Sequence, residues 1–218
     1  MFTCQTCGKE FALGQDVLDR YPGWTPRECM DCRNRGGRRA TPSASASRPS
    51  SSASRTKTRD LTVAEVLSSF TEGPDTGVFV DGASEGNPGP GGWGAVYVID
   101  GEIVDEAMGS DPYTTNNKME LTALIAGLRM VPLDAEIDVF TDSQLVVNIV
   151  TKWADGWKAK GWTKKSSGPI ANLDLVKKAH ALYKERPGVR LQWIKAHNGH
   201  RWNEYADALA TSYRRQVH

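Results

Sequence analysis

Beyond residue 32 this 218-residue chain has no cysteine, because Cys4, Cys7, Cys29 and Cys32 are the only four. No apolar run is long enough to span a membrane, and no N-terminal stretch resembles a signal peptide. We therefore expect a cytosolic protein without membrane contact. In a reducing compartment, paired cysteines are more often metal ligands than disulfides.

A strong net charge is also lacking, since 27 Lys and Arg balance 26 Asp and Glu. The overall balance therefore indicates no partner. The charges are nevertheless segregated along the chain. Residues 33–59 contain no acid, and their basic residues are Arg33, Arg35, Arg38, Arg39, Arg48, Arg55, Lys57 and Arg59.

The cysteines form two Cys-x-x-Cys pairs, Cys4–Cys7 and Cys29–Cys32, separated by 21 residues. Two such pairs supply the four soft ligands of a structural Zn²⁺ site, whose metal would provide folding energy to a segment too small to fold alone. Gly8 follows the first pair, where a tight turn needs a permissive backbone. A redox dithiol and unpaired thiols are the alternatives. The run from Cys7 to Phe11 resembles short zinc-ribbon modules, which predicts a module over residues 1–35.

Residues 36–76 read as a linker rich in Ser, Ala, Pro and Arg. Its first part lacks apolar periodicity and is predicted to be disordered. The positive charge would attract a phosphate backbone, although a passive soluble tether fits equally. Residues 61–70 have the apolar spacing of a short amphipathic helix.

Residues 77–214 predict one α/β domain. We expect strands at 77–82, 93–100, 102–109, 137–141 and 189–194, and helices at 117–130, 143–153, 170–185 and 202–214. Asn116 or Asn117 is the expected N-cap of the first of these helices. Three strands followed by alternating helices and strands predict a mixed five-stranded sheet flanked by helices.

Four acids occupy special positions in these elements. Asp81 ends an apolar run before a Gly- and Pro-rich loop, and Asp142 ends the fourth strand. Glu120 lies on the apolar face of one helix, and Asp207 lies in the last helix. Buried acids are rare unless they are paired or bind metal, and hard oxygen ligands select Mg²⁺ or Mn²⁺. Two such ions are the apparatus of phosphodiester hydrolysis.

Five motifs in order resemble type 1 ribonuclease H, over about residues 77–214. They are Asp81-Gly-Ala-Ser-Glu-Gly-Asn-Pro-Gly-Pro-Gly-Gly-Trp-Gly, Thr114-Thr-Asn-Asn-Lys-Met-Glu-Leu, Thr141-Asp-Ser-Gln, Lys195-Ala-His-Asn-Gly-His and Asn203-Glu-Tyr-Ala-Asp-Ala-Leu-Ala. The resemblance implies an RNase H-like fold and cleavage of the RNA strand of RNA–DNA hybrids, which leaves 5′-phosphate and 3′-hydroxyl ends.

By this resemblance Asp81, Glu120, Asp142 and Asp207 hold two Mg²⁺ ions, with Mn²⁺ as a substitute. His197 matches the family's mobile histidine, which shuttles protons or assists product release. Ala196 stands where the family usually has Gly, and Ser84 where Cys is frequent. Neither difference removes a catalytic group.

Substrate contacts are implied in the same way. Residues that match positions contacting the minor groove or a phosphate are Ser84, Asn87, Thr115, Asn116 and Gln144. The stretch from Lys152 to Lys165, called here the basic stretch, resembles the basic protrusion that grips the DNA strand. Lys158, Lys160 and Trp162 are its expected contacts, whereas Trp153 and Trp157, four residues apart, are expected to pack together.

Three functions are possible for this domain. An active hybrid nuclease is favoured because all four carboxylates are present. A noncatalytic hybrid-binding module would lack one of them, and a DNA-cutting relative would lack the 2′-hydroxyl readers. The N-terminal segment serves either nucleic-acid binding or recruitment of a protein partner, and a monomer is expected.

Overall fold

The computed structural model describes residues 1–5, 7–12, 60–164 and 168–215. The chain divides into two units, Met1–Thr56 and Lys57–His218, and each is described by itself. Cys29, Cys32 and the linker up to residue 59 lie outside the described residues. Among the described residues, no helix has the length and apolar character that a membrane span requires.

The described part of the first unit is a short hairpin. Strand β1 (Phe2–Thr3) pairs antiparallel with β2 (Glu10–Phe11). Between them Gly8 N donates to Cys4 O at 2.9 Å, and Gly8 has φ +71°. The predicted need for a permissive backbone after Cys7 is therefore confirmed.

The second unit is built on a five-stranded sheet of order β5-β4-β3-β6-β7. The strands are β3 (Gly77–Ser84), β4 (Gly89–Ile99), β5 (Glu102–Thr114), β6 (Ile137–Thr141) and β7 (Val189–Trp193). β3, β4 and β5 run antiparallel, whereas β6 pairs parallel with β3 and β7. The predicted mixed sheet is confirmed.

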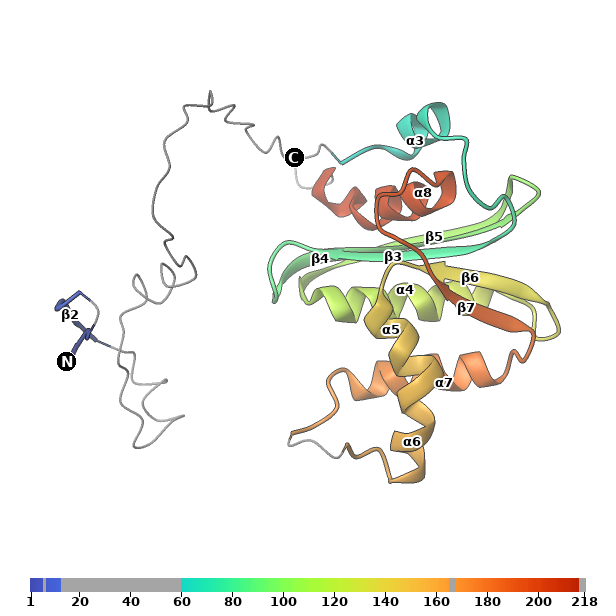
Figure 1. Cartoon of the computed structure of the whole chain (residues 1–218). Helices are drawn as coiled ribbons and strands as arrows, with labels where there is room; N and C mark the ends of the chain where they lie inside the picture. Colours follow the sequence, from blue (N-terminus) through green and yellow to red (C-terminus); the bar gives the residue numbers. More distant parts are fainter. Residues whose placement is uncertain (6, 13–59, 165–167, 216–218) are drawn as a thin grey trace, which may run out of the picture. The chain divides into compact units, whose positions relative to one another are not determined.

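Helices cover both faces of this sheet (Figure 1). The helices of the unit are α3 (Val63–Ser69), α4 (Asn116–Met130), α5 (Gln144–Asn148), the π-helical turn η1 (Ile149–Trp153), α6 (Ala154–Ala159), α7 (Leu173–Lys184), α8 (Arg201–Ala210) and the 3₁₀ turn η2 (Ser212–Arg215). α3 and α8 lie on one face, and α4 and α7 on the other.

Side-chain alternation along β3 divides the core into two clusters. Val78 and Val80 face α4 and α7, whereas Phe79 faces α8. Val66 of α3 is fully buried in the second cluster. Successive residues of a strand point to opposite faces, so one apolar run holds helices on both sides.

Three local features differ from the sequence predictions. β4 begins at Gly89, because the glycines expected in a loop pair with the neighbouring strands. Among them, Gly92 lies under α8, where a Cβ would meet Ala210 O at 2.4 Å. The second helix is interrupted by η1. The N-cap of α4 is Thr115, whose hydroxyl accepts from Lys118 N, and neither Asn116 nor Asn117.

Candidate active site

Asp81 and Asp142 lie side by side because of the parallel register of β3 and β6. Val78 is paired with Val139, and each acid lies three residues further along the chain. Asp81 is inside β3 rather than at its end, whereas Asp142 follows directly after β6. Trp193 of β7 donates from Nε1 to Asp142 O at 2.9 Å and so fixes the backbone of that turn.

Two glycines bring the remaining acids close to Asp81. A Cβ on Gly82 would lie 2.2 Å from Glu120 N, and a Cβ on Gly94 would lie 2.6 Å from Ala206 O. Gly94 is the cross-strand partner of Asp81. α4 and α8 can therefore approach the sheet closely beside Asp81, one carrying Glu120 and the other Asp207.

A pocket of about 250 Å³ collects these acids and is called here the carboxylate pocket. Its charged and titratable lining residues are Asp81, Glu120, Asp142, His197, Asp207 and Arg214. One ligand oxygen each from Asp81, Glu120 and Asp142 lie within 4.8 Å of one another. The sequence predicted that these four acids meet at the sheet, and the structure brings them together.

Burial and mutual repulsion disfavour ionisation of these acids. The pKa of Asp81 is raised well above its ordinary value by burial and then by Asp142, Asp207 and Glu120. Burial is also the largest cause for Glu120, whose pKa rises to about 7, and for Asp142 and Asp207, whose pKa values are also raised. Acids held in this way favour a cation among them.

One oxygen marks where a cation fits. Asn116 Nδ2 donates to Glu120 Oε1 at 2.8 Å, and Ser143 interacts with the same carboxylate and lowers its pKa, but the buried Glu120 Oε2 has no hydrogen bond of good geometry among the described residues. Buried polar atoms normally have partners. The acidic cluster can therefore hold a divalent metal ion, and its donor set fits a hard cation.

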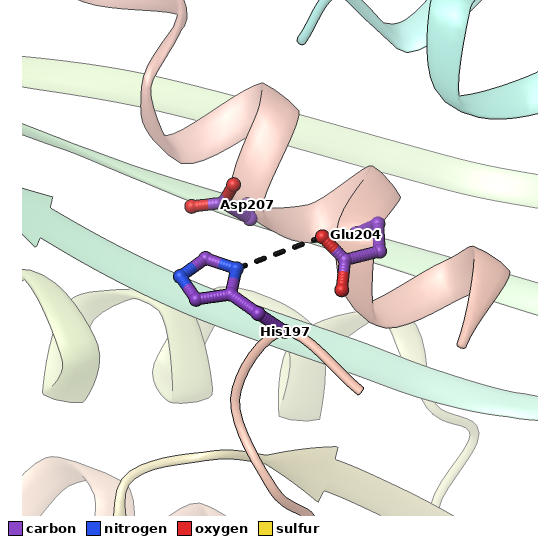
Figure 2. Close-up of side chains that lie close together, drawn as sticks. All are labelled: His197, Glu204 and Asp207. Atoms are coloured by element: carbon purple, nitrogen blue, oxygen red, sulfur yellow. Dashed lines mark ion pairs between the residues drawn. The ribbon is translucent and has the colours of Figure 1, made fainter. Parts of the chain in front are cut away.

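His197 and the buried Glu204 form a second part of the site. Figure 2 shows the imidazole of His197 beside Glu204 and Asp207, which both project from α8. His197 Nδ1 lies 3.6 Å from Glu204 Oε2, and the side chain is 74% exposed. Its charge lowers the pKa of both Asp142 and Asp207. An exposed histidine beside two acids is suited to proton transfer.

The family is decided by comparison with known proteins. The family model described as RNase H matches residues 74–215. This chain belongs to the RNase H family.

Individual relatives agree with the family. The chain is 46% identical over 136 residues to "Ribonuclease H" of Erythrobacter litoralis, covering 62% of this chain and 92% of that protein. It is 43% identical over 144 residues to "Ribonuclease HI" of Caulobacter vibrioides, covering 66% and 95%. This RNase H domain is thus that of a ribonuclease H, a hydrolase of the nuclease class.

A solved structure extends the likeness to three dimensions. The crystal structure of LC9-RNase H1, described as a type 1 RNase H with the type 2 active-site motif, is 33% identical with a TM-score of 0.51. The match covers 67% of this chain and 76% of that chain. α3 lies before residue 74 and hence outside the range that the family model matches.

Of the residues implied as substrate contacts, two line the carboxylate pocket of this RNase H domain and a third is hydrogen-bonded to one of these two. Ser84 and Asn116 line it. Asn87 Oδ1 accepts from Asn116 N at 3.0 Å, so the Gly- and Pro-rich turn is tied to the start of α4. Gln144 begins α5 and is exposed, and Thr115 caps α4.

The basic stretch lines a separate groove of about 720 Å³ between α4, α5, α6 and the loop before α7. Lys160 and Trp153 line it, and Lys158 is exposed outside it. The rings of Trp153 and Trp157 lie 5.9 Å apart, which confirms the expected packing.

Trp162 has a packing role that its sequence position did not indicate. Its ring lies edge-on to buried His180 at 6.0 Å, and Lys177 Nζ lies 5.6 Å from the ring centre. Trp153, which is 41% exposed, therefore presents more ring surface to a ligand than Trp162 does.

Sequence reasoning missed Arg214, which lines the carboxylate pocket, and Glu204, which contacts His197. Glu204 lies one helical turn before Asp207, so the i, i+3 spacing alone could have identified it. Arg214 had no such signal, because its approach to the pocket depends on where α8 ends and on the turn that follows.

Proposed function

We propose that this protein is an endonuclease that hydrolyses the RNA strand of RNA–DNA hybrids and leaves 5′-phosphate and 3′-hydroxyl ends. The observation that carries the proposal is the convergence of Asp81, Glu120, Asp142 and Asp207 in one pocket of an RNase H domain. Four acids in a pocket of this size are suited to binding cations rather than to acting as covalent nucleophiles.

The four carboxylates would hold two Mg²⁺ ions, or Mn²⁺ in their place. When bound, such ions supply positive charge for attack by water on phosphorus and for departure of the 3′ oxygen. The fold positions these ligands through the register of β3 and β6 and through Gly82 and Gly94, which let α4 and α8 approach the sheet closely. Glu120 Oε2, which has no hydrogen bond of good geometry among the described residues, supports a metal ligand at that position.

His197 is proposed to move protons at the edge of the site. Its backbone has φ +47°, a left-handed conformation that costs free energy for a residue with a Cβ, and a change of loop conformation can release this strain. The exposed imidazole lies beside Asp142 and Asp207, where it can pass a proton between the site and solvent.

Strand choice is assigned to the small polar residues around the turn. Only the 2′-hydroxyl distinguishes RNA from DNA locally, and it both donates and accepts hydrogen bonds. Ser84, Asn87, Asn116 and Gln144 are proposed to read it, and Thr115 to bind a DNA-strand phosphate. Asn116 also holds Glu120 Oε1, which couples recognition to a metal ligand.

The basic stretch is proposed to bind the DNA strand. Lys158 and Lys160 are exposed and provide salt-sensitive attraction to phosphates. Trp162 was the ring expected to contact the strand, and Trp153 is added because its ring is more exposed.

The N-terminal segment is proposed to hold a structural Zn²⁺ ion through Cys4, Cys7, Cys29 and Cys32. Its basic linker would add phosphate contacts, with recruitment of a protein partner as the alternative. Zinc content of the purified chain checks the metal site. A monomeric state and a cytosolic location stay predictions.

Cleavage of matched substrates tests the function. A hybrid, a DNA duplex and an RNA duplex of one sequence are incubated with the protein in Mg²⁺ and in EDTA. We expect RNA-strand cuts in the hybrid only, with 5′-phosphate ends and none in EDTA. Binding without cleavage would favour a noncatalytic module, and cleavage of the DNA duplex would favour a DNA nuclease.

A further inference from the structure

Arg214 is the only lysine or arginine among the described residues that line the carboxylate pocket. It lies in η2, directly after α8, and its side chain is 27% exposed. A phosphodiester backbone is anionic, and it must approach four acids to be cut. A guanidinium in the wall of such a pocket is well placed to contact a phosphate.

The guanidinium of Arg214 is held from two sides. Nη1 donates to Asp60 Oδ1 at 2.7 Å, and Nε lies 3.1 Å from Glu85 Oε1. Nε also donates to Tyr213 Oη at 3.2 Å. These contacts fix the plane of the group from two segments far apart in sequence.

The N–H groups on Nη2 of Arg214 remain available to a ligand. Arg has five N–H groups, two of them on Nη2. The described residues provide no acceptor for Nη2, whereas Nε and Nη1 both have partners. Arg214 is therefore oriented but not saturated, which is the state expected of a side chain that binds an anion.

We propose that Arg214 binds, through Nη2, a phosphate of the RNA strand next to the one that is cut. The inference rests on the proposed function, because the phosphate next to the cut belongs to the strand that enters the carboxylate pocket. The two N–H groups of Nη2 can each donate to an anionic oxygen in a direction that the contacts of Nε and Nη1 fix, whereas the ammonium of a lysine has no such fixed donor direction.

Asp60 acts as a positioning residue for Arg214. It begins a segment that precedes the range matched by the family model. Thr62 and Glu65 form a capping box at α3, and Val66 is buried against α8. Arg201 also donates to Leu67 O at 3.0 Å, so the segment is fastened to α8 at a second point.

Arg215 provides a matched control. It donates to Leu61 O at 3.2 Å and to Ala208 O at 2.8 Å, so it ties the same segment to the end of α8. It is not among the described residues that line the carboxylate pocket. A purely structural role for Arg214 predicts the same phenotype for both arginines, whereas phosphate binding separates them.

The test compares the wild-type full-length chain with Arg214→Ala, Arg214→Lys and Arg215→Ala. kcat and KM for a labelled hybrid are measured in Mg²⁺ at several KCl concentrations, together with Tm. For Arg214→Ala we expect KM to rise about tenfold with kcat nearly unchanged, from loss of a charge-assisted hydrogen bond. The slope of log(kcat/KM) against log[KCl] should become shallower by about 0.9.

Arg214→Lys keeps the positive charge but loses the oriented N–H donors of the guanidinium. Its KM should therefore be intermediate, and its salt slope should equal that of the wild type. Arg215→Ala should lower Tm, because it loses the contacts to Leu61 and Ala208, but its KM should equal that of the wild type. Asp60→Asn should raise KM and keep the salt slope, since the arginine charge remains, and a lowered KM would contradict positioning.

Wild-type KM and salt slope in Arg214→Ala would overturn the inference, even if its Tm falls. If that variant fails to fold, a wild-type KM in Arg214→Lys with a wild-type KM in Asp60→Asn would overturn it. Absence of hybrid cleavage by the wild type would instead refute the proposed function, so the two failures are distinguishable.

Discussion

Glu120 has one oxygen held by Asn116 and a second oxygen that is buried without a hydrogen bond of good geometry among the described residues. Its pKa of about 7 in the folded protein lies above its ordinary value of 4.5. Between these pH values the folded metal-free protein binds more protons than the unfolded chain. Stability without metal therefore falls as pH rises from about 4.5 to about 7 and stays low above that range.

Replacing this acid should stabilise the metal-free protein. In EDTA at pH 8, Glu120→Gln should raise the free energy of unfolding by up to about 3 kcal/mol, and at pH 4 it should give little gain. The glutamine can still accept from Asn116. Denaturation at both pH values measures the effect, with exposed Glu102→Gln as control. Equal stability of variant and wild type at pH 8 would contradict the burial argument.

The sequence predicted the residues whose roles follow from local motifs. Asp81, Glu120, Asp142 and Asp207 were identified because each ends or faces an apolar pattern that the family motifs share. Arg214 was not, because its position depends on a 3₁₀ turn and on Asp60, 154 residues away. Contacts of this kind follow from tertiary packing and leave no periodic signal.

Gly82 shows how a strand and a helix together position a ligand. A Cβ at this residue would lie 2.2 Å from Glu120 N and 2.5 Å from Met119 C, which are backbone atoms that cannot turn aside. A larger residue must therefore push the first turns of α4 away from β3. Because Glu120 lies in that turn, its distance from Asp81 would grow.

Gly82→Ala should thus impair both stability and activity. We expect a loss of about 1–3 kcal/mol in the free energy of unfolding, as for overpacked cores, and a weaker response of cleavage to Mg²⁺. The matched control is Gly156→Ala in α6, where a Cβ meets nothing within 4 Å and helix propensity favours Ala. If both alanine variants bind Mg²⁺ as the wild type does, close approach at Gly82 is not what positions Glu120.

At the scale of elements, the five strands of a mixed sheet and the apolar helix face that carries Glu120 followed from alternation and periodicity. Element ends did not. β4 starts among glycines that any local reading places in a loop, because Gly89 serves the turn, where a Cβ would meet Glu85 O, while Gly92 and Gly94 make room for α8. The π-helical turn η1 shifts the register between α5 and α6 and likewise depends on packing.

The chain as a whole has a formal net charge of +1, although its residues 33–59 are strongly basic. Removing residues 1–59 deletes all eight basic residues of the segment 33–59 while keeping Asp60. We expect hybrid binding to weaken at low salt and the slope of log K against log[KCl] to become shallower, because fewer counterions are released. Titration of a labelled hybrid at several KCl concentrations measures both, and an unchanged slope would favour protein recruitment.

Asp142→Asn tests most directly whether the carboxylate pocket cuts RNA through bound metal. Asp142 is half-buried at the end of β6, and amide nitrogen is a poor ligand for Mg²⁺. The account predicts at least about 10²-fold slower Mg²⁺-dependent hybrid cleavage, since several kcal/mol of stabilisation are lost. Tm in EDTA should not fall, because a repelling charge is removed. Wild-type cleavage by a folded Asp142→Asn protein would contradict the assignment of the site.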